Sequence, residues 1–277
     1  MKKIPFTKMV GAGNDFVVID TANLSSQTDL KKFGIAVCHR HNGIGADGVL
    51  ILELSRKADY KMRIINSDGS EAEMCGNGAR CMAAYIVRNR NEKKKQFAME
   101  TLAGIVLAEA KEEMANVRLS DPKDYRADIA IQINGRPLRV SYIDSGVPHT
   151  VVFVDGLKTI DVDILGAMIR QHEHFKPRGT NVNFVEQLRE DLVELRTFER
   201  GVDAETLACG TGSVASALIS YLQAHPMTKT QKGASMKVKT KSGEILDVSF
   251  DLKAGAFSNV WLKGSAKFIA RGEYYYV

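Results

Sequence analysis

The chain contains an internal repeat centred on two cysteines. The stretches "EAEMCGNGARCMAAYIV" (residues 71–87) and "AETLACGTGSVASALIS" (residues 204–220) both place a cysteine before a Gly-x-Gly turn and a largely apolar segment. Cys75 and Cys209 are 134 positions apart, and a glutamate lies four residues before each of them. Self-similarity at a fixed offset predicts one structural unit that is written twice.

The similarity extends to both sides of the cysteines. Upstream, "GIGADGVLILE" matches "RGTNVNFVEQ" and "NDFVVID" matches "PHTVVFVD", while downstream "METLAGIVLAEA" matches "VKTKSGEILDVSF". Each half therefore predicts alternating strands, one apolar helix and a hairpin. Because a helix that is apolar nearly all round should be enclosed, we expect an α+β fold of two pseudo-symmetric domains, each a curled mixed β-sheet around a central helix. The alternative is a single sheet protein with two helices that are similar by chance.

The length of 277 residues favours two domains of ordinary size. We expect an N-terminal domain of residues 1–121 that carries Cys75 and is completed by a C-terminal strand at 268–277. The C-terminal domain is then expected over residues 122–267 and carries Cys209.

The composition is that of a globular protein, with 44% apolar and 26% charged residues. The N-terminal stretch is too polar for a secretory signal or a membrane span, so we expect a cytoplasmic protein without a membrane contact. The net charge is +5, but the basic run at 88–95 lacks aromatic neighbours, so nucleic-acid binding is not expected. The four cysteines are expected to be reduced.

The start of a helix suits a carboxylate, because its first N–H groups are unpaired and the helix dipole is positive there. Glycines in this turn should give a ligand access to the backbone. The same field should lower the pKa of a neighbouring thiol from about 8.5 toward neutrality.

Two such sites that face one another across the domain junction would suit a racemase with two bases. One thiolate would remove the α-hydrogen of an amino acid, and the opposite thiol would protonate the other face. The amides at both helix starts would stabilise charge on the reacting carboxylate. This chemistry needs neither a metal nor a cofactor, so none is expected.

Other roles for the cysteines are possible. Cys38 and Cys81 are best explained as small core residues. The stretch "CHRHNG" resembles a metal-binding cluster but lacks a second cluster at zinc-finger spacing. A structural disulfide between Cys75 and Cys209 is a further alternative.

Five motifs together resemble the diaminopimelate epimerase family, in the family's order and over essentially the whole chain. They are "GAGNDFVVID", "GIGADG", "NSDGSEAEMCGNGARC", "GTNVNFV" and "FERGVDAETLACGTG". The resemblance implies a cofactor-independent enzyme that interconverts LL- and meso-diaminopimelate in the synthesis of lysine and peptidoglycan precursors.

The resemblance also implies roles for individual residues. Cys75 and Cys209 would be the catalytic pair. The substrate would be bound by two groups of residues: the helix-start amides of Gly76, Asn77, Gly210 and Thr211, and the side chains of Asn14, Asn66, Asn181, Glu199 and Arg200. Arg200 would form a bidentate contact with the distal carboxylate of the substrate. A homodimer is possible.

The chain departs from the family pattern at two points. Val147 stands where many relatives carry asparagine in Gly-Asn-Pro-His, and the turn Gly201–Ala204 is one residue longer than the shortest family version. Both changes bear on substrate selectivity rather than on the thiols.

Two other functions compete with this one. The first is a cofactor-independent racemase for proline, hydroxyproline or histidine. Asn77, where proline-type enzymes typically place a histidine, and Arg200 argue for a substrate with a charged distal group. The second is a non-catalytic module that binds carboxylates, which would need no thiol.

Overall fold

The computed structural model describes residues 2–276 and divides into two compact units. Unit 1 comprises Met1–Arg118 and Lys263–Val277, and unit 2 comprises Leu119–Leu262. We propose that each unit is one domain of the duplicated chain.

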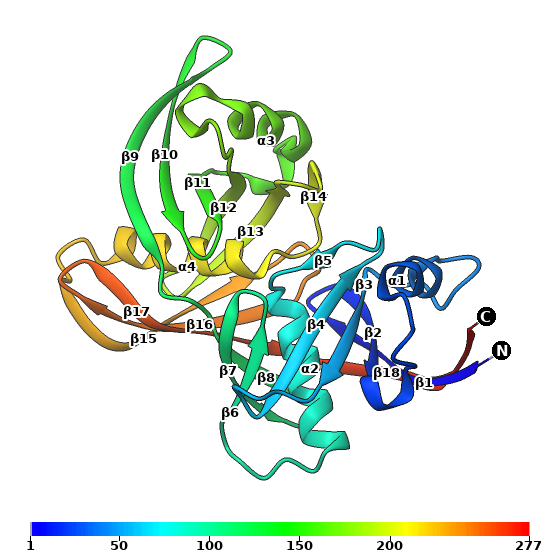
Figure 1. The fold of residues 1–277 in the computed structure, drawn as a ribbon. Helices are drawn as coiled ribbons and strands as arrows, with labels where there is room; N and C mark the ends of the chain where they lie inside the picture. The colour runs from blue at the N-terminus through cyan, green and yellow to red at the C-terminus, as the bar shows by residue number, and fades with distance from the viewer. Residues whose placement is uncertain (1, 277) are drawn as a thin grey trace. The chain divides into compact units, whose positions relative to one another are not determined.

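Unit 1 contains two helices and a mixed set of strands (Figure 1). Its elements are β1 (Lys2–Gly11), β2 (Asn14–Asp20), η1 (Thr21–Asn23), α1 (Leu30–Cys38), β3 (Gly48–Glu53), β4 (Tyr60–Asn66), β5 (Glu71–Ala72), α2 (Gly76–Asn89), β6 (Phe97–Thr101), β7 (Gly104–Lys111), β8 (Met114–Arg118) and β18 (Lys267–Tyr276). Strands β2 and β3 pair in parallel across the connection that contains α1. Strand β4 then pairs antiparallel with β3 and parallel with β6. The C-terminal strand β18 pairs antiparallel with β1.

Unit 2 repeats this order of elements. They are β9 (Lys123–Ile133), β10 (Arg136–Asp144), β11 (Pro148–Phe153), η2 (Leu157–Thr159), α3 (Val162–Gln171), η3 (Glu173–Phe175), β12 (Asn181–Arg189), β13 (Leu192–Glu199), β14 (Ala204–Thr206), α4 (Gly210–Ala224), β15 (Thr230–Lys239), β16 (Ile245–Lys253) and β17 (Ala256–Ser265), whose last residues belong to unit 1. Strands β11 and β12 pair in parallel, and β13 pairs antiparallel with β12 and parallel with β15. The same pairings in both units confirm the duplication expected from the sequence.

The second helix of each repeat is enclosed by its own sheet. Helix α2 packs against β1, β2, β3, β4, β7 and β8, and α4 packs against β10, β11, β12, β13, β15 and β16. Figure 1 shows the strands of each unit curling around this helix. The predicted fold class, with a curled mixed sheet around a central helix in each half, is confirmed.

The outer helices cover the other face of each sheet. In unit 1, Phe33 and Val37 of α1 pack with Val17 of β2 and Val49 of β3. In unit 2, α3 packs in the same way over β11 and β12. Since strand residues alternate between faces, the neighbouring positions on these strands face the central helix.

Glycines in the left-handed backbone region mark equivalent loops in the two units. Gly13 and Gly146 precede β2 and β11 with φ of 94° and 109°, and Gly45 and Gly179 precede β3 and β12 with φ of 77° and 64°. An L-residue rarely adopts such angles, so these glycines serve as matched markers of the repeat. They align "GND" at 13–15 with "GVP" at 146–148.

The repeated glutamates have a structural role in both units. Arg63 Nε donates to Glu71 Oε1 at 2.7 Å, and Arg196 Nε donates to Glu205 Oε1 at 2.7 Å. In each case a long strand is tied to the short strand that leads to the cysteine. The equivalent arginine–glutamate contact in the two units explains why a glutamate recurs four residues before each cysteine.

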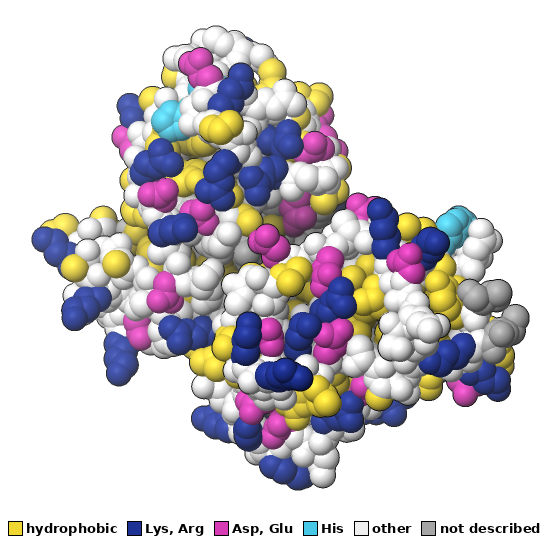
Figure 2. Space-filling model, viewed as in Figure 1, with side chains coloured by type: hydrophobic (Ala, Val, Ile, Leu, Met, Phe, Trp, Pro, Cys, Tyr) yellow, Lys and Arg dark blue, Asp and Glu magenta, His cyan; other side chains and the backbone are white. Residues whose placement is uncertain are grey.

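Charged side chains of both signs are interspersed on the face drawn in Figure 2. Within the basic run at 88–95, Arg90 pairs with Asp20 and Lys94 pairs with Asp59. Part of the positive charge of this run is therefore compensated inside unit 1.

Candidate active site

Each cysteine of the repeat is the N-cap residue of its central helix. Cys75 precedes α2 with φ −143° and ψ 116°, and Cys209 precedes α4 with φ −114° and ψ 115°. This extended backbone directs the chain into the first helical turn. The Gly78 N–H donates to Cys75 Sγ at 3.4 Å, whereas Cys209 Sγ lies 3.5 Å from Thr211 Oγ1.

Asn77 and Asn14, both expected near the substrate, are bonded to one another in unit 1. Asn77 Nδ2 donates to Asn14 Oδ1 at 2.7 Å, and Asn14 Nδ2 donates to Asp47 Oδ2 at 3.0 Å. Arg80 Nη2, on the next turn of α2, donates to Asn77 Oδ1 at 2.8 Å. Both amides are therefore fixed in one orientation. Asp47 and Arg80 were not predicted as part of this site. Asp47 is distant in the sequence from its partner Asn14, and Arg80 lies within a helix whose sequence is otherwise largely apolar.

The carboxylates beside Asn14 are held by cations. Arg40 bridges Asp15 and Asp47, and Lys8 Nζ donates to Asp15 Oδ2 at 2.7 Å. Burial opposes ionisation of Asp15, but its contacts with Arg40 and Lys8 outweigh burial and lower its pKa to about 2. Asp15 is therefore ionised at neutral pH.

Asn66 and Gly76 lie at the ends of adjoining elements in unit 1. Asn66 is the last residue of β4, and its Nδ2 donates to Ser70 Oγ at 3.0 Å within the following turn. Gly76 is the first residue of α2. Asn66 thus belongs to the turn that leads to Cys75.

In unit 2, Asn181 holds the backbone at Arg200. Asn181 Oδ1 accepts the Arg200 N–H at 2.9 Å, and its Nδ2 donates to the Pro148 carbonyl at 2.9 Å. Arg200 Nη1 donates to the Arg178 carbonyl at 2.8 Å. The structure brings these two expected substrate residues into direct contact.

Glu199, the last residue of β13, acts on Cys209. Burial raises the pKa of the Cys209 thiol well above its usual value, and the charge of Glu199 and its hydrogen bond to the thiol raise it further. Burial likewise raises the pKa of Glu199. The expectation that the helix field brings the thiol toward neutrality is therefore wrong for Cys209, because burial and a neighbouring carboxylate outweigh the helix start. Cys209 is a protonated thiol at neutral pH.

Two polar residues beneath α4 were not assigned from the sequence. His149 and Asn183 are both 0% exposed, and Asn183 Nδ2 lies 3.0 Å from His149 Nδ1. His149 Nε2 lies 2.9 Å from Thr211 Oγ1, next to Cys209. Burial lowers the pKa of His149 to about 3, and the charge of Arg200 contributes to this shift. The Gly-Val-Pro-His motif at residues 146–149 drew attention to this segment, but no local pattern in the sequence indicated that His149 contacts Thr211.

Gly78 and Gly212 each lie close to a strand side chain of their own unit. A Cβ at Gly212 would lie 2.5 Å from Asn183 Oδ1, and a Cβ at Gly78 would lie 3.0 Å from Leu50 Cδ2. These glycines therefore let the helix approach the strands beneath it, which is a different reason from the ligand access expected from the sequence.

The "CHRHNG" stretch has a structural explanation. Cys38 is 3% exposed, and burial raises its pKa to about 11. His39 Nδ1 accepts the N–H groups of His41 and Asn42 at 3.2 and 3.0 Å in the turn after α1. Across residues 2–276, no three His, Cys, Asp or Glu side chains form a group that could hold a metal. None of the four cysteines, all of which lie within the described residues, forms a disulfide.

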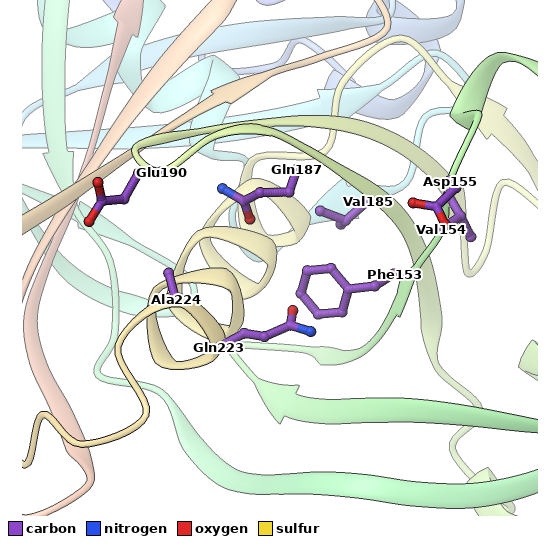
Figure 3. Close-up of a pocket in the computed structure, with 8 residues that line it drawn as sticks. All are labelled: Phe153, Val154, Asp155, Val185, Gln187, Glu190, Gln223 and Ala224. Carbon is purple, nitrogen blue, oxygen red and sulfur yellow. The ribbon is translucent and has the colours of Figure 1, made fainter.

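A concave pocket of about 450 Å³ lies elsewhere in unit 2, at the end of α4 remote from Cys209 (Figure 3). Its lining consists of Phe153, Val154, Asp155, Val185, Gln187, Glu190, Gln223 and Ala224. Two carboxylates and no basic side chain line it, so it is unsuited to a carboxylate substrate. The helix starts are the stronger candidate.

Comparison with known proteins agrees with the duplicated site. The family model described as diaminopimelate epimerase matches residues 6–123 and, a second time, residues 141–258. The chain belongs to the diaminopimelate epimerase family. It is 40% identical over 279 residues to the diaminopimelate epimerase of Aquifex aeolicus (strain VF5), with 96% of each chain covered. It is 44% identical over 254 residues to that of Archaeoglobus fulgidus, covering 86% of this chain and 89% of the relative.

Solved structures similar to this member of the diaminopimelate epimerase family share its fold. One is a phenazine biosynthesis protein of the PhzF family from Bacillus anthracis, with a TM-score of 0.74, 17% identity and 99% of both chains covered. Another is a hydroxyproline epimerase from Agrobacterium vitis, with a TM-score of 0.71, 14% identity, and 99% of this chain and 92% of that chain covered. No helix within residues 2–276 has the length and apolar character needed to cross a membrane.

Proposed function

We propose that this chain epimerises LL-diaminopimelate to meso-diaminopimelate and that Cys75 and Cys209 act on opposite faces of the α-carbon. The observation that carries the proposal is the repeated Cys-Gly-x-Gly helix start, present once in each unit of a chain that belongs to the epimerase family. A non-catalytic carboxylate module would need neither thiol.

The proposed reaction moves one proton at each face. A thiolate takes the α-proton, and the electron pair left on carbon is delocalised into the carboxylate. The amides of Gly76, Asn77, Gly210 and Thr211 stabilise that charge. The opposite thiol then gives its proton to the other face, so each turnover exchanges one thiolate for one thiol. Both protons are carried by the protein's own side chains, and we propose no cofactor.

The environment of Cys209 supports its assignment as the acid in the resting protein. Burial and Glu199 raise its pKa, so the sulfur holds its proton at neutral pH. In this state Cys75 serves as the base. The roles are reversed for the opposite stereoisomer, because the product of one direction is the substrate of the other.

We propose that the distal amino acid group of the substrate is recognised by polar side chains. Arg200 suits the distal carboxylate, since a guanidinium makes two parallel hydrogen bonds to it. Glu199, Asn14, Asn66 and Asn181 are proposed to read the ammonium group and its orientation. The hydrogen bond between Asn181 and the Arg200 backbone supports a shared role.

The proposal includes a reducing environment and a second copy of the chain. None of the four cysteines, all within the described residues, forms a disulfide, and the mechanism requires reduced sulfur, which favours the cytoplasm. Ile269 and Tyr275 on β18 are 57% and 53% exposed, which favours a homodimer that covers apolar surface. Sedimentation equilibrium at several concentrations tests this: a constant monomer mass contradicts the homodimer.

The test of the main proposal is α-proton exchange in deuterated water. Incubation with LL-diaminopimelate and a reductant, without added pyridoxal phosphate, should yield the meso isomer with deuterium at one α-carbon. Proline, hydroxyproline and histidine serve as competing substrates. Inversion of one of these, with none of diaminopimelate, would assign the chain to a different racemase activity, whereas binding without any exchange would favour the non-catalytic alternative.

A further inference from the structure

The turn before Asn14 lies directly against the start of α2. Gly11 pairs with Asn14 at the end of the β1–β2 hairpin, and Ala12 and Gly13 form its two-residue turn with φ of 52° and 94°. A Cβ at Gly11 would lie 3.1 Å from the carbonyl oxygen of Asn77. Because the two backbones approach so closely, the side chains can bond directly, and Asn77 Nδ2 donates to Asn14 Oδ1 at 2.7 Å.

A buried cation sets the direction of this amide pair from one end. Arg80 is 0% exposed, and its Nη2 donates to Asn77 Oδ1 at 2.8 Å. A guanidinium only donates hydrogen bonds, so the Asn77 atom that faces it must be the oxygen. The Asn77 nitrogen then points to Asn14 and requires an acceptor, which is the Asn14 oxygen. Arg80 thereby sets the direction of both amides.

A carboxylate sets the same direction from the other end. Asp47 Oδ2 accepts from Asn14 Nδ2 at 3.0 Å and from the Asp15 N–H at 3.1 Å. A carboxylate oxygen requires a donor, so the nitrogen of Asn14 must face Asp47. This is the orientation that Arg80 demands from the opposite side. The hydrogen bonds therefore run in one direction, from Arg80 through Asn77 and Asn14 to Asp47.

Asp47 is itself held in place at the start of β3. Its N–H donates to Asp15 Oδ1 at 3.1 Å, so the two aspartates bond to one another's backbone. They directly precede Phe16 and Gly48, which are paired residues of the parallel strands β2 and β3. Arg40 Nη2 donates to both carboxylates, at 2.9 and 2.8 Å. Asp47 is thus a fixed point from which Asn14 can be oriented.

The two amides differ in their access to a ligand. Asn77 is 2% exposed, whereas Asn14 is half-buried. An amide oxygen has two lone pairs, so Asn14 Oδ1 can accept a second hydrogen bond besides the one from Asn77. We propose that Asp47 and Arg80 are positioning residues for substrate recognition, which hold Asn14 with its oxygen toward the start of α2 and its nitrogen toward Asp47.

This orientation matters because of the charge of the ligand group. The inference rests on the proposed function in taking Asn14 as a residue that reads the substrate ammonium. An ammonium group only donates, so it needs the oxygen of Asn14. A reversed amide would present N–H donors to a cation and weaken its binding. The chain of hydrogen bonds prevents that reversal, since it would place donor against donor at Asp15 and at Asn77.

The first test follows the amides themselves and uses no substrate. In protein labelled with nitrogen-15 asparagine, NMR measures the exchange of side-chain NH₂ hydrogens with solvent, and Asn14→Ala and Asn77→Ala variants assign the signals. Arg80→Met should speed exchange at Asn14 about fivefold, the scale of one hydrogen bond, because Asn77 is released to turn. The Asn66 amide, which bonds Ser70, should be unchanged.

Matched variants separate orientation from general stability. Asp47→Ala should speed exchange at Asn77, which is the far amide from that end. Asp59→Ala is its control in unit 1, because Asp59 likewise accepts a backbone N–H, from Ala98 at 2.9 Å, and pairs with a cation, Lys94. It should leave both amides unchanged.

Arg80→Lys tests the buried end, since it keeps a donor that Arg80→Met removes. Exchange at Asn14 in Arg80→Lys should therefore be closer to native than in Arg80→Met. Native exchange at Asn14 in an Arg80→Met protein that is folded by circular dichroism overturns the proposal. Equal speeding at Asn14 and Asn66 also overturns it, because it would report a loss of stability rather than of orientation.

The second test is a double-mutant cycle on diaminopimelate kinetics. Asp47→Ala should raise KM about fivefold, with a smaller change in kcat, since one oriented hydrogen bond to bound substrate is lost. In an Asn14→Ala background the same change should alter KM by less than about twofold, because Asp47 acts through Asn14. Additive effects of the two substitutions overturn the positioning role.

The two tests distinguish this inference from the proposed function. A protein that does not epimerise diaminopimelate but shows the expected exchange at Asn14 and Asn77 rejects the proposed function and retains the orientation by Asp47 and Arg80. A protein that epimerises diaminopimelate while its two amides respond independently rejects the inference and retains the proposed function.

Discussion

Asn77 Nδ2 donates to Asn14 Oδ1 at 2.7 Å in unit 1, and the repeat equivalents of these residues, Thr211 and Val147, cannot form such an amide pair. Thr211 is instead bonded to His149 through its side chain, and its carbonyl accepts the Ser145 hydroxyl at 2.9 Å. The duplicated helix starts are therefore supported by different chemistry.

Replacing either cysteine of the repeat by alanine should remove epimerisation. Because each face of the α-carbon has its own base, we expect Cys75→Ala and Cys209→Ala to lower kcat by about 10³-fold or more, at the scale of losing a catalytic acid or base. Polarimetry of the diaminopimelate interconversion measures this. Cys38→Ala is the matched control and should retain turnover, because Cys38 lies in the core of unit 1. Near-native turnover by either single variant would show that one thiol is enough.

The activity should depend on pH as expected for one thiolate and one thiol. We expect a bell-shaped profile of kcat/KM, whose two apparent pKa values belong to the coupled pair. Since Glu199 and burial raise the pKa of Cys209, Glu199→Gln should move one limb of the profile to lower pH. A profile that is unchanged in Glu199→Gln contradicts the electrostatic role of this carboxylate.

His149 should make folding stability sensitive to acid. Its pKa is about 3 in the folded protein, against about 6.5 when unfolded, so between these values the unfolded chain binds a proton that the folded protein does not. Stability is therefore lost as the pH falls below 6.5, by up to about 1.4 kcal/mol per pH unit from this group. Urea unfolding at pH 7, 6 and 5 should show a steeper decline for the native chain than for His149→Phe. Equal slopes would mean that folding does not lower the pKa of His149.

The repeat, the enclosed helices and the cysteine positions followed from the sequence because they depend on local patterns. Periodicity and glycine placement are properties of neighbouring residues, so α2 and α4 were expected where they occur. The buried, hydrogen-bonded pair of Asn183 and His149 was not expected from the sequence, because polar residues in an alternating strand are ordinarily assigned to the solvent face. Only the pairing of β11, β12 and β13 beneath α4 makes them buried partners. The raised pKa of Cys209 has the same origin, since it depends on burial and on Glu199, which is ten residues away in sequence.

The two helix-start glycines should respond differently to alanine. At Gly212 a Cβ would lie 2.5 Å from Asn183 Oδ1, whose amide is held by hydrogen bonds, so we expect Gly212→Ala to cost about 1–3 kcal/mol of unfolding free energy. At Gly78 the nearest atom is the end of the Leu50 side chain, which can move. In Gly78→Ala, the gain in helix propensity, about 1 kcal/mol, should therefore largely offset the cost in unfolding free energy of the close contact with Leu50. Denaturant unfolding of both variants checks the difference, and equal costs would contradict it.

The distal selectivity should depend on Arg200. Replacing it by lysine or methionine should cost about 2–5 kcal/mol in kcat/KM for diaminopimelate, the range for breaking a buried charged contact. Lysine cannot reproduce the bidentate contact of a guanidinium. The reactivity of Cys75 toward small thiol reagents should be unchanged, which separates lost recognition from a damaged site. Full diaminopimelate activity in an Arg200 variant would remove the distal-carboxylate role and favour a different amino-acid substrate.

Val147 offers the complementary experiment. Gly146 gives this loop the same left-handed turn that Gly13 gives the loop before Asn14, so an asparagine at 147 should be accommodated as it is at 14. Val147→Asn places an amide at the position equivalent to Asn14, and we expect the turnover of diaminopimelate to be unchanged or improved. Activity toward lysine and histidine should not rise, because neither has a distal carboxylate for Arg200. Steady-state kinetics with the three substrates decides this, and a Val147→Asn variant that gains activity on lysine or histidine would show that this loop limits access rather than reading the distal group.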